Sequence, residues 1–343
     1  MNLQQKALQN LENILEKNYL INSTERLKDN FAIIYDLQSP LAKLLSETYF
    51  QLLPKAKKLA FYEYSAEEVK DFVNSLVKGS LVVLVESSSF RMSSFRWRLE
   101  LFNRSLKVIE HAHLGTNLPE ESENYVDSLE DQNARFQSVG NFLKGKLEKC
   151  SEVKICSDSE NILTYSSEME PVKKNIADFS GMHNIGCAFP IGEVFTEPKN
   201  LGAINGSILV YALANEQFRV VIYDNPFKVT VKNGVIEWDE NFPEEFKQIY
   251  GVVSKENNNG AVPIRELGLG MNKGISKEKK LTDISAFERV CGPHISVGLK
   301  HDIYRDKFDK NTVQHFHIDI FPVCERIEID GLTVFENGDY QLS

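Results

Sequence analysis

The spacing of apolar residues along the chain changes between its two halves. In the first half, runs with helical spacing alternate with short apolar runs typical of strands. Helices are expected over residues 1–18, 65–79, 96–106 and 119–150, and strands over 81–87 and 107–115. The segment 65–79 carries the clearest boundaries, since it opens on Ser65 as a cap and ends on Gly79. This alternation predicts an α/β domain with a parallel sheet over residues 1–178.

The second half has the pattern of a β-rich domain. Alternating or β-branched runs occupy residues 206–213, 218–224, 227–238, 294–299, 315–323 and 324–342. The dipeptide Asn233-Gly234, inside VKNGVI, is a strong signal for a tight β-hairpin. We therefore expect a β-rich α+β domain over residues 179–343, built on a mainly antiparallel sheet or barrel.

Length and composition fit an intracellular enzyme. A chain of 343 residues is long enough for two domains, and its 42% hydrophobic and 26% charged residues are ordinary for a globular protein. The first 18 residues have amphipathic spacing without the basic and apolar segments of a signal peptide. Five cysteines without a CxxC pair indicate reduced thiols and argue against cysteine-ligated zinc. The sequence predicts a cytoplasmic protein with no membrane partner.

The charge balance argues against nucleic acid as a partner. The formal net charge is −10, which disfavours nonspecific binding to a polyanion. One segment, residues 88–104, carries four arginines among aromatic residues. It is interpreted as a helix with solvated arginines, and a local basic patch is the less favoured alternative.

The segment HFHIDIF, residues 315–321, has the pattern of a metal-binding strand. Because side chains alternate along a strand, His315, His317 and Asp319 share one face and the apolar residues share the other. An imidazole and a carboxylate two positions apart can bind one divalent ion. The alternative is an edge strand whose polar face meets only water.

Three further residues have surroundings that suit metal ligands. His294 follows Gly292-Pro293 at the start of an expected strand. Glu193 and Glu266 lie among apolar and glycine residues, where a carboxylate is costly to bury unless it is paired or bound to a metal. The alternative is an ion pair with an arginine, for which Arg265 is the neighbour of Glu266.

The ordered motifs GEVFTEP, RELGLGMN, PHISVGL and HFHIDIF resemble the C-terminal region of the aminopeptidase T and aminopeptidase S-like superfamily of metallopeptidases. The resemblance covers about residues 180–322. It implies an aminopeptidase T-like fold, a homodimer and the metal ligands Glu193, Glu266, His294, His317 and Asp319, with Glu266 bridging two ions. The superfamily also includes 2,5-dihydroxypyridine 5,6-dioxygenase.

Two positions depart from the pattern of this superfamily. A further glutamate ligand precedes the family histidine by five positions, but Arg289 stands there in this chain, with Glu288 beside it. Arginine stays protonated and cannot ligate a metal. The family tyrosine seven positions after the same histidine is replaced by His301, with Tyr304 nearby.

These residues lead to three hypotheses. The first is a metalloaminopeptidase that uses Zn, Co or Mn to activate water and remove N-terminal residues from short peptides, with Arg289, His301 or Tyr304 stabilising the oxyanion. The second is a mononuclear Fe(II) ring-cleaving dioxygenase of small molecules, with His294, His317 and Asp319 as ligands. The third is a catalytically inactive relative. The first is favoured because Glu193 and Glu266, which a one-metal triad does not need, are both present.

Overall fold

The computed structural model describes residues 1–90, 97–257, 260–298, 300, 302–304 and 316–342. Its contacts divide the chain into two compact units. The first contains Met1–Asn133, Asn175–Ile191 and Glu278–Ala286, and the second contains Ala134–Lys174, Gly192–Lys277 and Phe287–Ser343. The division is interleaved, whereas the sequence predicts a single boundary between residues 178 and 179.

The first unit is built on a five-stranded parallel sheet with the order β2-β1-β3-β4-β8. The strands are β1 (Phe31–Tyr35), β2 (Lys57–Ala60), β3 (Leu81–Val85), β4 (Lys107–His111) and β8 (Gly186–Phe189). The central strand β3 is buried at every position, because helices cover both faces of the sheet. The parallel sheet agrees with the prediction for this half of the chain.

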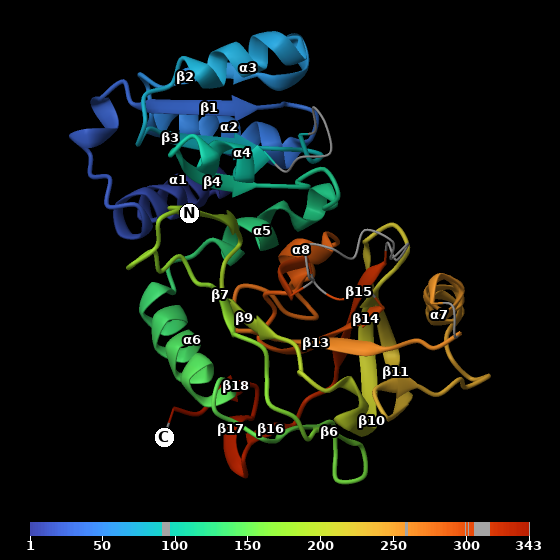
Figure 1. Ribbon diagram of the computed structural model, residues 1–343. Coiled ribbons are helices and arrows are strands. Elements are labelled where there is room, and N and C mark those ends of the chain that lie inside the picture. The colour runs from blue at the N-terminus through green and yellow to red at the C-terminus, as the bar shows by residue number, and fades with distance from the viewer. Residues whose placement is uncertain (91–96, 258–259, 299, 301, 305–315, 343) are drawn as a thin grey trace. The chain divides into compact units, whose positions relative to one another are not determined.

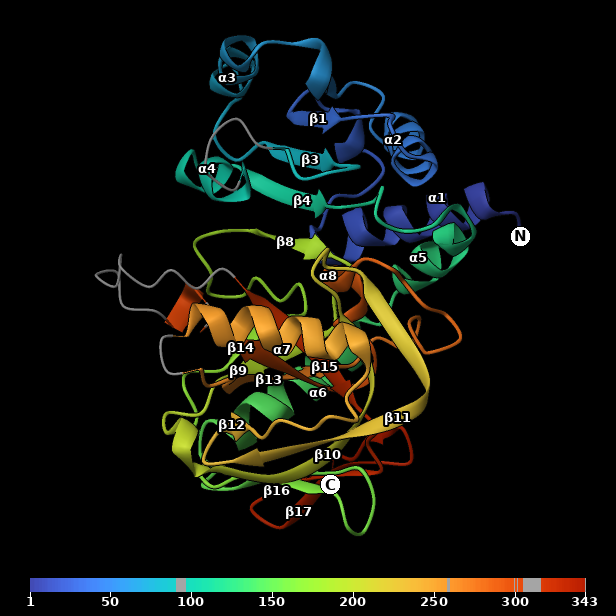
Figure 2. The ribbon, with the colours of Figure 1, turned by 90° about the vertical axis from the view of Figure 1, so that its right-hand side faces the viewer.

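Helices pack on both faces of this sheet (Figures 1 and 2). The helical elements are α1 (Leu3–Asn13) with a π turn (Ile14–Asn18), α2 (Pro40–Leu52), α3 (Ala66–Asn74), α4 (Trp97–Asn103), α5 (Ser122–Ser128), most of α8 (Ile284–Phe287), and 3-10 turns at Glu25–Leu27, Phe61–Glu63 and Pro119–Glu121. Val69 of α3 and Leu101 of α4 join the apolar cluster on one face, together with Ala32 and Leu84 of the sheet. Burial of such side chains contributes roughly 1.5–3 kcal/mol each.

Local capping explains where the predicted helices begin and end. Helix α3 starts after Ser65, which forms a capping box with Glu68, as the sequence suggests. The long helix expected over 119–150 is instead divided into a 3-10 turn, α5 and a separate helix, α6 (Asn133–Leu147). The interruption falls in the segment SLEDQN, whose Ser, Asp and Asn side chains compete with helical hydrogen bonds.

The second unit contains a 13-stranded sheet built on antiparallel strand pairs (Figure 1). Its main path is β18-β17-β16-β5-β6-β10-β15-β14-β13-β9-β7, and β11 pairs with β10 and β12. The strands are β5 (Val153–Cys156), β6 (Ile162–Tyr165), β7 (Lys173–Asn175), β9 (Glu193–Thr196), β10 (Ile204–Ala214), β11 (Val220–Lys232), β12 (Val235–Ile236), β13 (Ile264–Gly270), β14 (Gly292–Gly298), β15 (His317–Pro322), β16 (Arg326–Ile329), β17 (Leu332–Glu336) and β18 (Asp339–Tyr340). The other elements are α6, α7 (Glu244–Glu256) and the 3-10 turns Leu201–Ala203 and Asp302–Tyr304.

Two features of this sheet bear on the sequence predictions. Strands β5 and β6, which fall within the predicted N-terminal domain, pair with β16 and β10 and so belong to the second sheet. The hairpin at Asn233-Gly234 is confirmed: both residues have positive φ angles, of 52° and 76°, and connect β11 to β12. In the described part of the chain, no helix has both the length and the apolar character needed to cross a bilayer.

Candidate metal centre

The five candidate metal ligands come from four neighbouring strands of the second unit. Glu193 begins β9, Glu266 lies on β13, His294 on β14, and His317 and Asp319 on β15. The cross-strand register places Gly270 opposite Glu193, Gly268 opposite His294 and Ser296 opposite Asp319. The antiparallel pairing therefore brings residues far apart in sequence to one region of the sheet.

Side chains alternate along each strand, so the candidate ligands lie on one face and the apolar core residues on the other. On β13, Leu267 and Leu269 are fully buried apolar residues, and they alternate with Glu266, Gly268 and Gly270. The same alternation separates His294 and Ser296 from Ile295 and Val297 on β14, and His317 and Asp319 from Ile318 and Ile320 on β15. One face of these strands packs into the core, and the other carries imidazoles, carboxylates and small residues.

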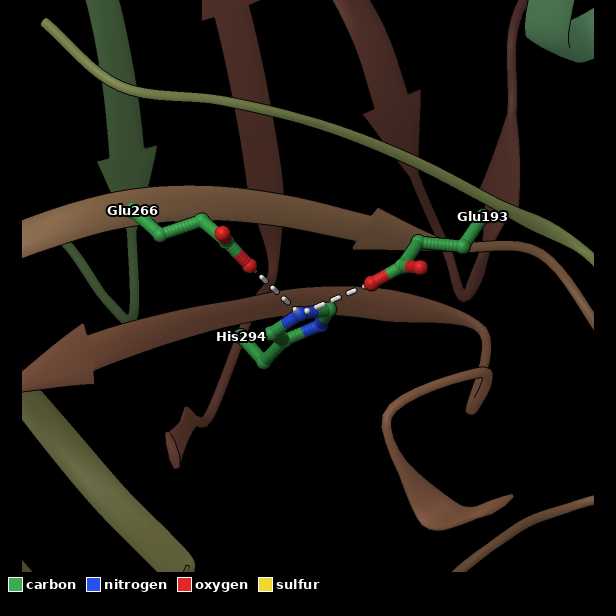
Figure 3. Close-up of side chains that lie close together, drawn as sticks. All are labelled: Glu193, Glu266 and His294. Carbon is green, nitrogen blue, oxygen red and sulfur yellow. Dashed lines mark ion pairs between the residues drawn. The ribbon is translucent and has the colours of Figure 1, made fainter. Parts of the chain in front are cut away.

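Two groups of residues have ligand atoms close enough to hold an ion. The first is Glu193, Glu266 and His294, and the second is Glu266, His317 and Asp319, with the atoms of each group within 4.8 Å of one another. His294 Nε2 lies 3.1 Å from Glu193 Oε1 and 3.8 Å from Glu266 Oε1 (Figure 3). His317 Nε2 lies 3.6 Å from Asp319 Oδ1. Glu266 is common to both groups, as expected for a bridging position.

Burial and charge together favour a cation among these side chains. Glu193, Glu266, His294 and Asp319 are each at most 5% exposed. Burial raises the pKa of Glu266. Burial alone lowers the pKa of His294, but contacts with Glu193 and Glu266 outweigh it and hold this pKa well above its usual range. A positive charge between the two glutamates is strongly stabilised.

Several polar atoms of the centre are buried and have no hydrogen-bond partner among the described residues. They are Glu266 Oε2, Asp319 Oδ1, and Nδ1 and Nε2 of His294. The 3.1 Å contact between His294 Nε2 and Glu193 lacks hydrogen-bond geometry, so we describe it as an ion contact. Buried carboxylate oxygens and imidazole nitrogens without partners are costly unless they coordinate a metal. The donor set therefore fits a divalent ion.

Arg289 contributes a permanent positive charge beside the first group. Its Nη1 lies 2.6 Å from Glu193 Oε2 and also donates to Glu288 Oε1. Burial lowers the pKa of Arg289, but the neighbouring carboxylates raise it by more. Burial raises the pKa of Glu288 well above its usual range. The predicted alternative, a glutamate paired with an arginine, thus holds for Glu193. Arg265, the sequence neighbour of Glu266, instead donates through Nε to the carbonyl of Gly298, 2.6 Å away.

The other predicted site residues are placed differently. Tyr304 is half-buried and its hydroxyl donates to the carbonyl of Pro171, 3.0 Å away. Burial raises its pKa, and the charge of Glu266 contributes to the same direction. His301 and His315 lie outside the described residues.

The predicted one-metal triad does not form one group among the described residues. His294 is grouped with Glu193 and Glu266, and it is Glu266 that joins His317 and Asp319. The register of β14 with β15 sets Ser296, not His294, opposite Asp319, and Gly298 opposite His317.

Sequence reasoning missed the small residues that make room for the ligands. A Cβ atom on Gly268 would lie 2.0 Å from His294 Nε2, so the imidazole occupies the space that any other residue would fill. Ser296 Oγ accepts a hydrogen bond from the backbone N–H of Glu266 at 2.9 Å and ties β13 to β14. The alternation of Glu, Gly and Gly in RELGLG is the signal that could have revealed this cradle.

We predict that Gly268→Ala lowers metal affinity or activity about 10-fold to 100-fold, because the imidazole of His294 must move away from Glu193 and Glu266. Competition with a chromophoric chelator measures the change in affinity. Gly251→Ala in α7 is the matched control, since no atom of the described residues outside its own helix lies within 4 Å of the added Cβ. Equal affinity and activity in Gly268→Ala and the wild type would contradict the role given to this glycine.

Comparison with known proteins identifies the fold. No family model matches the sequence, and no curated protein matches it. The structure of 2,5-dihydroxypyridine dioxygenase from Pseudomonas putida KT2440 is similar, with a TM-score of 0.63 and 12% identity over 98% of this chain and 97% of that chain. Wild-type AmpT from Thermus thermophilus is also similar, with a TM-score of 0.58 and 12% identity over 99% and 100%. The predicted resemblance to this superfamily is confirmed at the level of the fold.

Proposed function

We propose that this protein is a metal-dependent hydrolase that holds one divalent ion through Glu266, His317 and Asp319 and removes N-terminal residues from short peptides. The observation that carries the proposal is the position of Arg289. Its guanidinium lies against Glu193 and Glu288, so the first group already has a cation beside it. Among the described residues, no arginine or lysine forms an ion pair with Asp319. A second metal beside Arg289 would add charge repulsion.

The composition of the second group favours hydrolysis over oxygen chemistry. Two carboxylates and one imidazole differ from the two-histidine, one-carboxylate set of non-haem iron oxygenases. A divalent ion bound there would supply Lewis-acid chemistry, lowering the pKa of a water and polarising a carbonyl. The similarity to AmpT supports this choice, because its name describes an aminopeptidase.

The protein's own residues have separate roles in this proposal. His294, in contact with Glu193, holds a proton next to the metal ligands. Arg289 donates a hydrogen bond to Glu193 and so holds this carboxylate in place. The hydrogen bond from the Glu266 N–H to Ser296 fixes the strand that carries the shared ligand. These contacts make the imidazole and carboxylate pair the proton acceptor or donor for hydrolysis.

A second candidate function is a mononuclear Fe(II) dioxygenase of small aromatic molecules. The observation that favours it is the same Arg289 contact, since a single-ion site is what such an enzyme requires. The structure of 2,5-dihydroxypyridine dioxygenase has the same fold. For this function the candidate iron ligands are Glu266, His317 and Asp319, whereas the sequence predicts His294 in place of Glu266.

Metal analysis and paired assays test the proposal. Protein purified without added metal or chelator should contain about one divalent ion per chain. It should hydrolyse leucine p-nitroanilide with Zn, Co or Mn, and it should not consume oxygen with Fe(II) and a dihydroxypyridine. Oxygen uptake without hydrolysis would replace the first function by the second, and protein without bound metal or either activity would favour an inactive relative.

We predict that Asp319→Asn removes the metal and lowers hydrolysis at least about 100-fold, because the amide is a weaker ligand than a buried carboxylate. Elemental analysis and the p-nitroanilide assay measure the two effects. Asp224→Asn, at an exposed position of β11, is the control. Retention of both metal and activity in Asp319→Asn would rule out the assigned ligand set.

A further inference from the structure

Three side chains of the first unit form a relay that is separate from the metal ligands. His113 Nε2 forms a short hydrogen bond with Ser89 Oγ. On the other side of the ring, His113 Nδ1 lies 3.4 Å from Asp283 Oδ1. Serine at Nε2 and aspartate at Nδ1 is the arrangement of a Ser-His-Asp catalytic triad.

The topology of the parallel sheet brings Ser89 and His113 together. Ser89 follows β3 and His113 follows β4, and Val85 pairs with His111 at the ends of these neighbouring strands. The N–H groups of Leu114 and Gly115 donate to the carbonyls of Glu86 and Ser87, each at 2.9 Å. The carboxyl ends of parallel strands are where α/β sheets commonly bind ligands.

Asp283 is held rigidly in a buried position. It is 3% exposed, its N–H donates to Asn117 Oδ1 at 3.1 Å, and its Oδ2 accepts from Ser285 Oγ at 2.6 Å. The preceding residue, Thr282, donates through N and Oγ1 to the two oxygens of buried Glu121, at 2.9 and 2.8 Å. This network fixes the carboxylate that faces the histidine.

The arrangement sets the protonation of the imidazole. A carboxylate at Nδ1 favours the tautomer with hydrogen on that nitrogen, which leaves the lone pair of Nε2 to accept the hydroxyl proton of Ser89. His113 has a φ of 55°, in the left-handed region, and its side chain is 40% exposed. Strained backbone positions cluster at functional sites, and this exposure lets a small substrate reach the ring.

We propose that Ser89, His113 and Asp283 form a second, metal-independent active site that hydrolyses small carboxylic esters. Ser89 Oγ bonds to the ester carbonyl carbon while its proton passes to His113 Nε2. The carbon–oxygen bond to the alcohol breaks, and the alcohol takes that proton from His113. Water then attacks the acyl-serine, His113 accepts the water proton and returns it to Ser89 Oγ, and the carboxylic acid leaves. Ser89 and His113 are the catalytic residues, and Asp283 is a positioning residue.

The surroundings of Ser89 indicate the class of ester. Tyr62 is 50% exposed and its hydroxyl lies 2.8 Å from Oγ of the neighbouring Ser88, so an aromatic ring borders the serine segment. Within the described residues, the backbone N–H groups of Ser88 and Ser89 have no hydrogen bond and are available to a developing oxyanion. An aryl ester with a short acyl group matches this open, aromatic-bordered setting.

The test uses the full-length protein after treatment with a chelator, which separates this activity from the metal centre. With p-nitrophenyl acetate we expect hydrolysis that Ser89→Ala reduces at least about 100-fold and that Ser75→Ala, at an exposed position of the same unit, leaves unchanged. Asp283→Asn should reduce the rate and shift the pH profile, because it removes the charge that orients His113. Circular dichroism checks that each variant is folded.

Covalent labelling gives a second readout that needs no variant. Ser89 Oγ should bond to the phosphorus of a fluorophosphonate as fluoride leaves and the hydroxyl proton passes to His113, and mass spectrometry of the wild type should place the phosphonyl adduct on Ser89. An adduct on another residue, equal hydrolysis by Ser89→Ala, or neither hydrolysis nor labelling by the wild type would overturn the proposal.

Discussion

Replacing Arg289 by methionine is expected to destabilise the second unit by about 3–5 kcal/mol. Arg289 is 7% exposed and contacts both buried Glu193 and partly exposed Glu288, and its loss leaves these two carboxylates without that cation. Urea unfolding followed by the emission of Trp238, in a Trp97→Phe background, reports on this unit, because the chain has two tryptophans, one in each unit.

Two further substitutions sharpen this prediction. Arg135→Met is the control, since Arg135 pairs with Asp339 at a partly exposed position and its loss should cost only about 1 kcal/mol or less. Arg289→Glu restores the residue type that the superfamily pattern has at this position, and bound metal should rise from about one to about two ions per chain. An unchanged stability in Arg289→Met, or an unchanged metal count in Arg289→Glu, would show that Arg289 is not a substitute for a metal ion.

The first unit is expected to lose on the order of 4 kcal/mol of stability as the pH falls from about 6.5 to 3, through His111 alone. This histidine is fully buried between Tyr49 and Tyr125, whose hydroxyls lie 2.9 Å from Nε2 and 3.0 Å from Nδ1. Burial lowers its pKa from 6.5 to about 3. Between these two values the unfolded chain binds a proton that the folded unit does not, so acid favours unfolding.

His111→Gln should flatten this acid dependence, because glutamine keeps polar atoms between the tyrosines but does not titrate. Urea unfolding at pH 7 and pH 4, followed by the emission of buried Trp97 in a Trp238→Phe background, measures the difference. His183→Gln replaces an exposed histidine of the same unit and should leave the pH dependence as in the wild type. An equal loss of stability on acidification in His111→Gln and the wild type would contradict the assignment.

The comparison of sequence and structure shows where local patterns carry information. The alternation in HFHIDIF and RELGLG predicts strands with one polar face, and the structure has both strands, with Glu266 and Asp319 buried on them. Such patterns depend on side-chain direction over two residues, which covalent geometry imposes. In the segment 119–150, apolar spacing did not predict where one helix ends and the next begins. Two helices with a break between them keep nearly the same apolar spacing as one long helix.

The sequence by itself determined the placement of the candidate ligands on strands, the Asn233-Gly234 hairpin and the parallel and antiparallel character of the two halves. Only the tertiary structure decided that β5 and β6 join the second sheet, that Glu266 is shared by two ligand groups, and that Arg289 lies against Glu193. It also brought His113 next to both Ser89 and Asp283, although 170 positions separate His113 from Asp283 along the chain. These outcomes depend on cross-strand register and burial, which are set by the packing of distant segments and leave no periodic signal in any one of them.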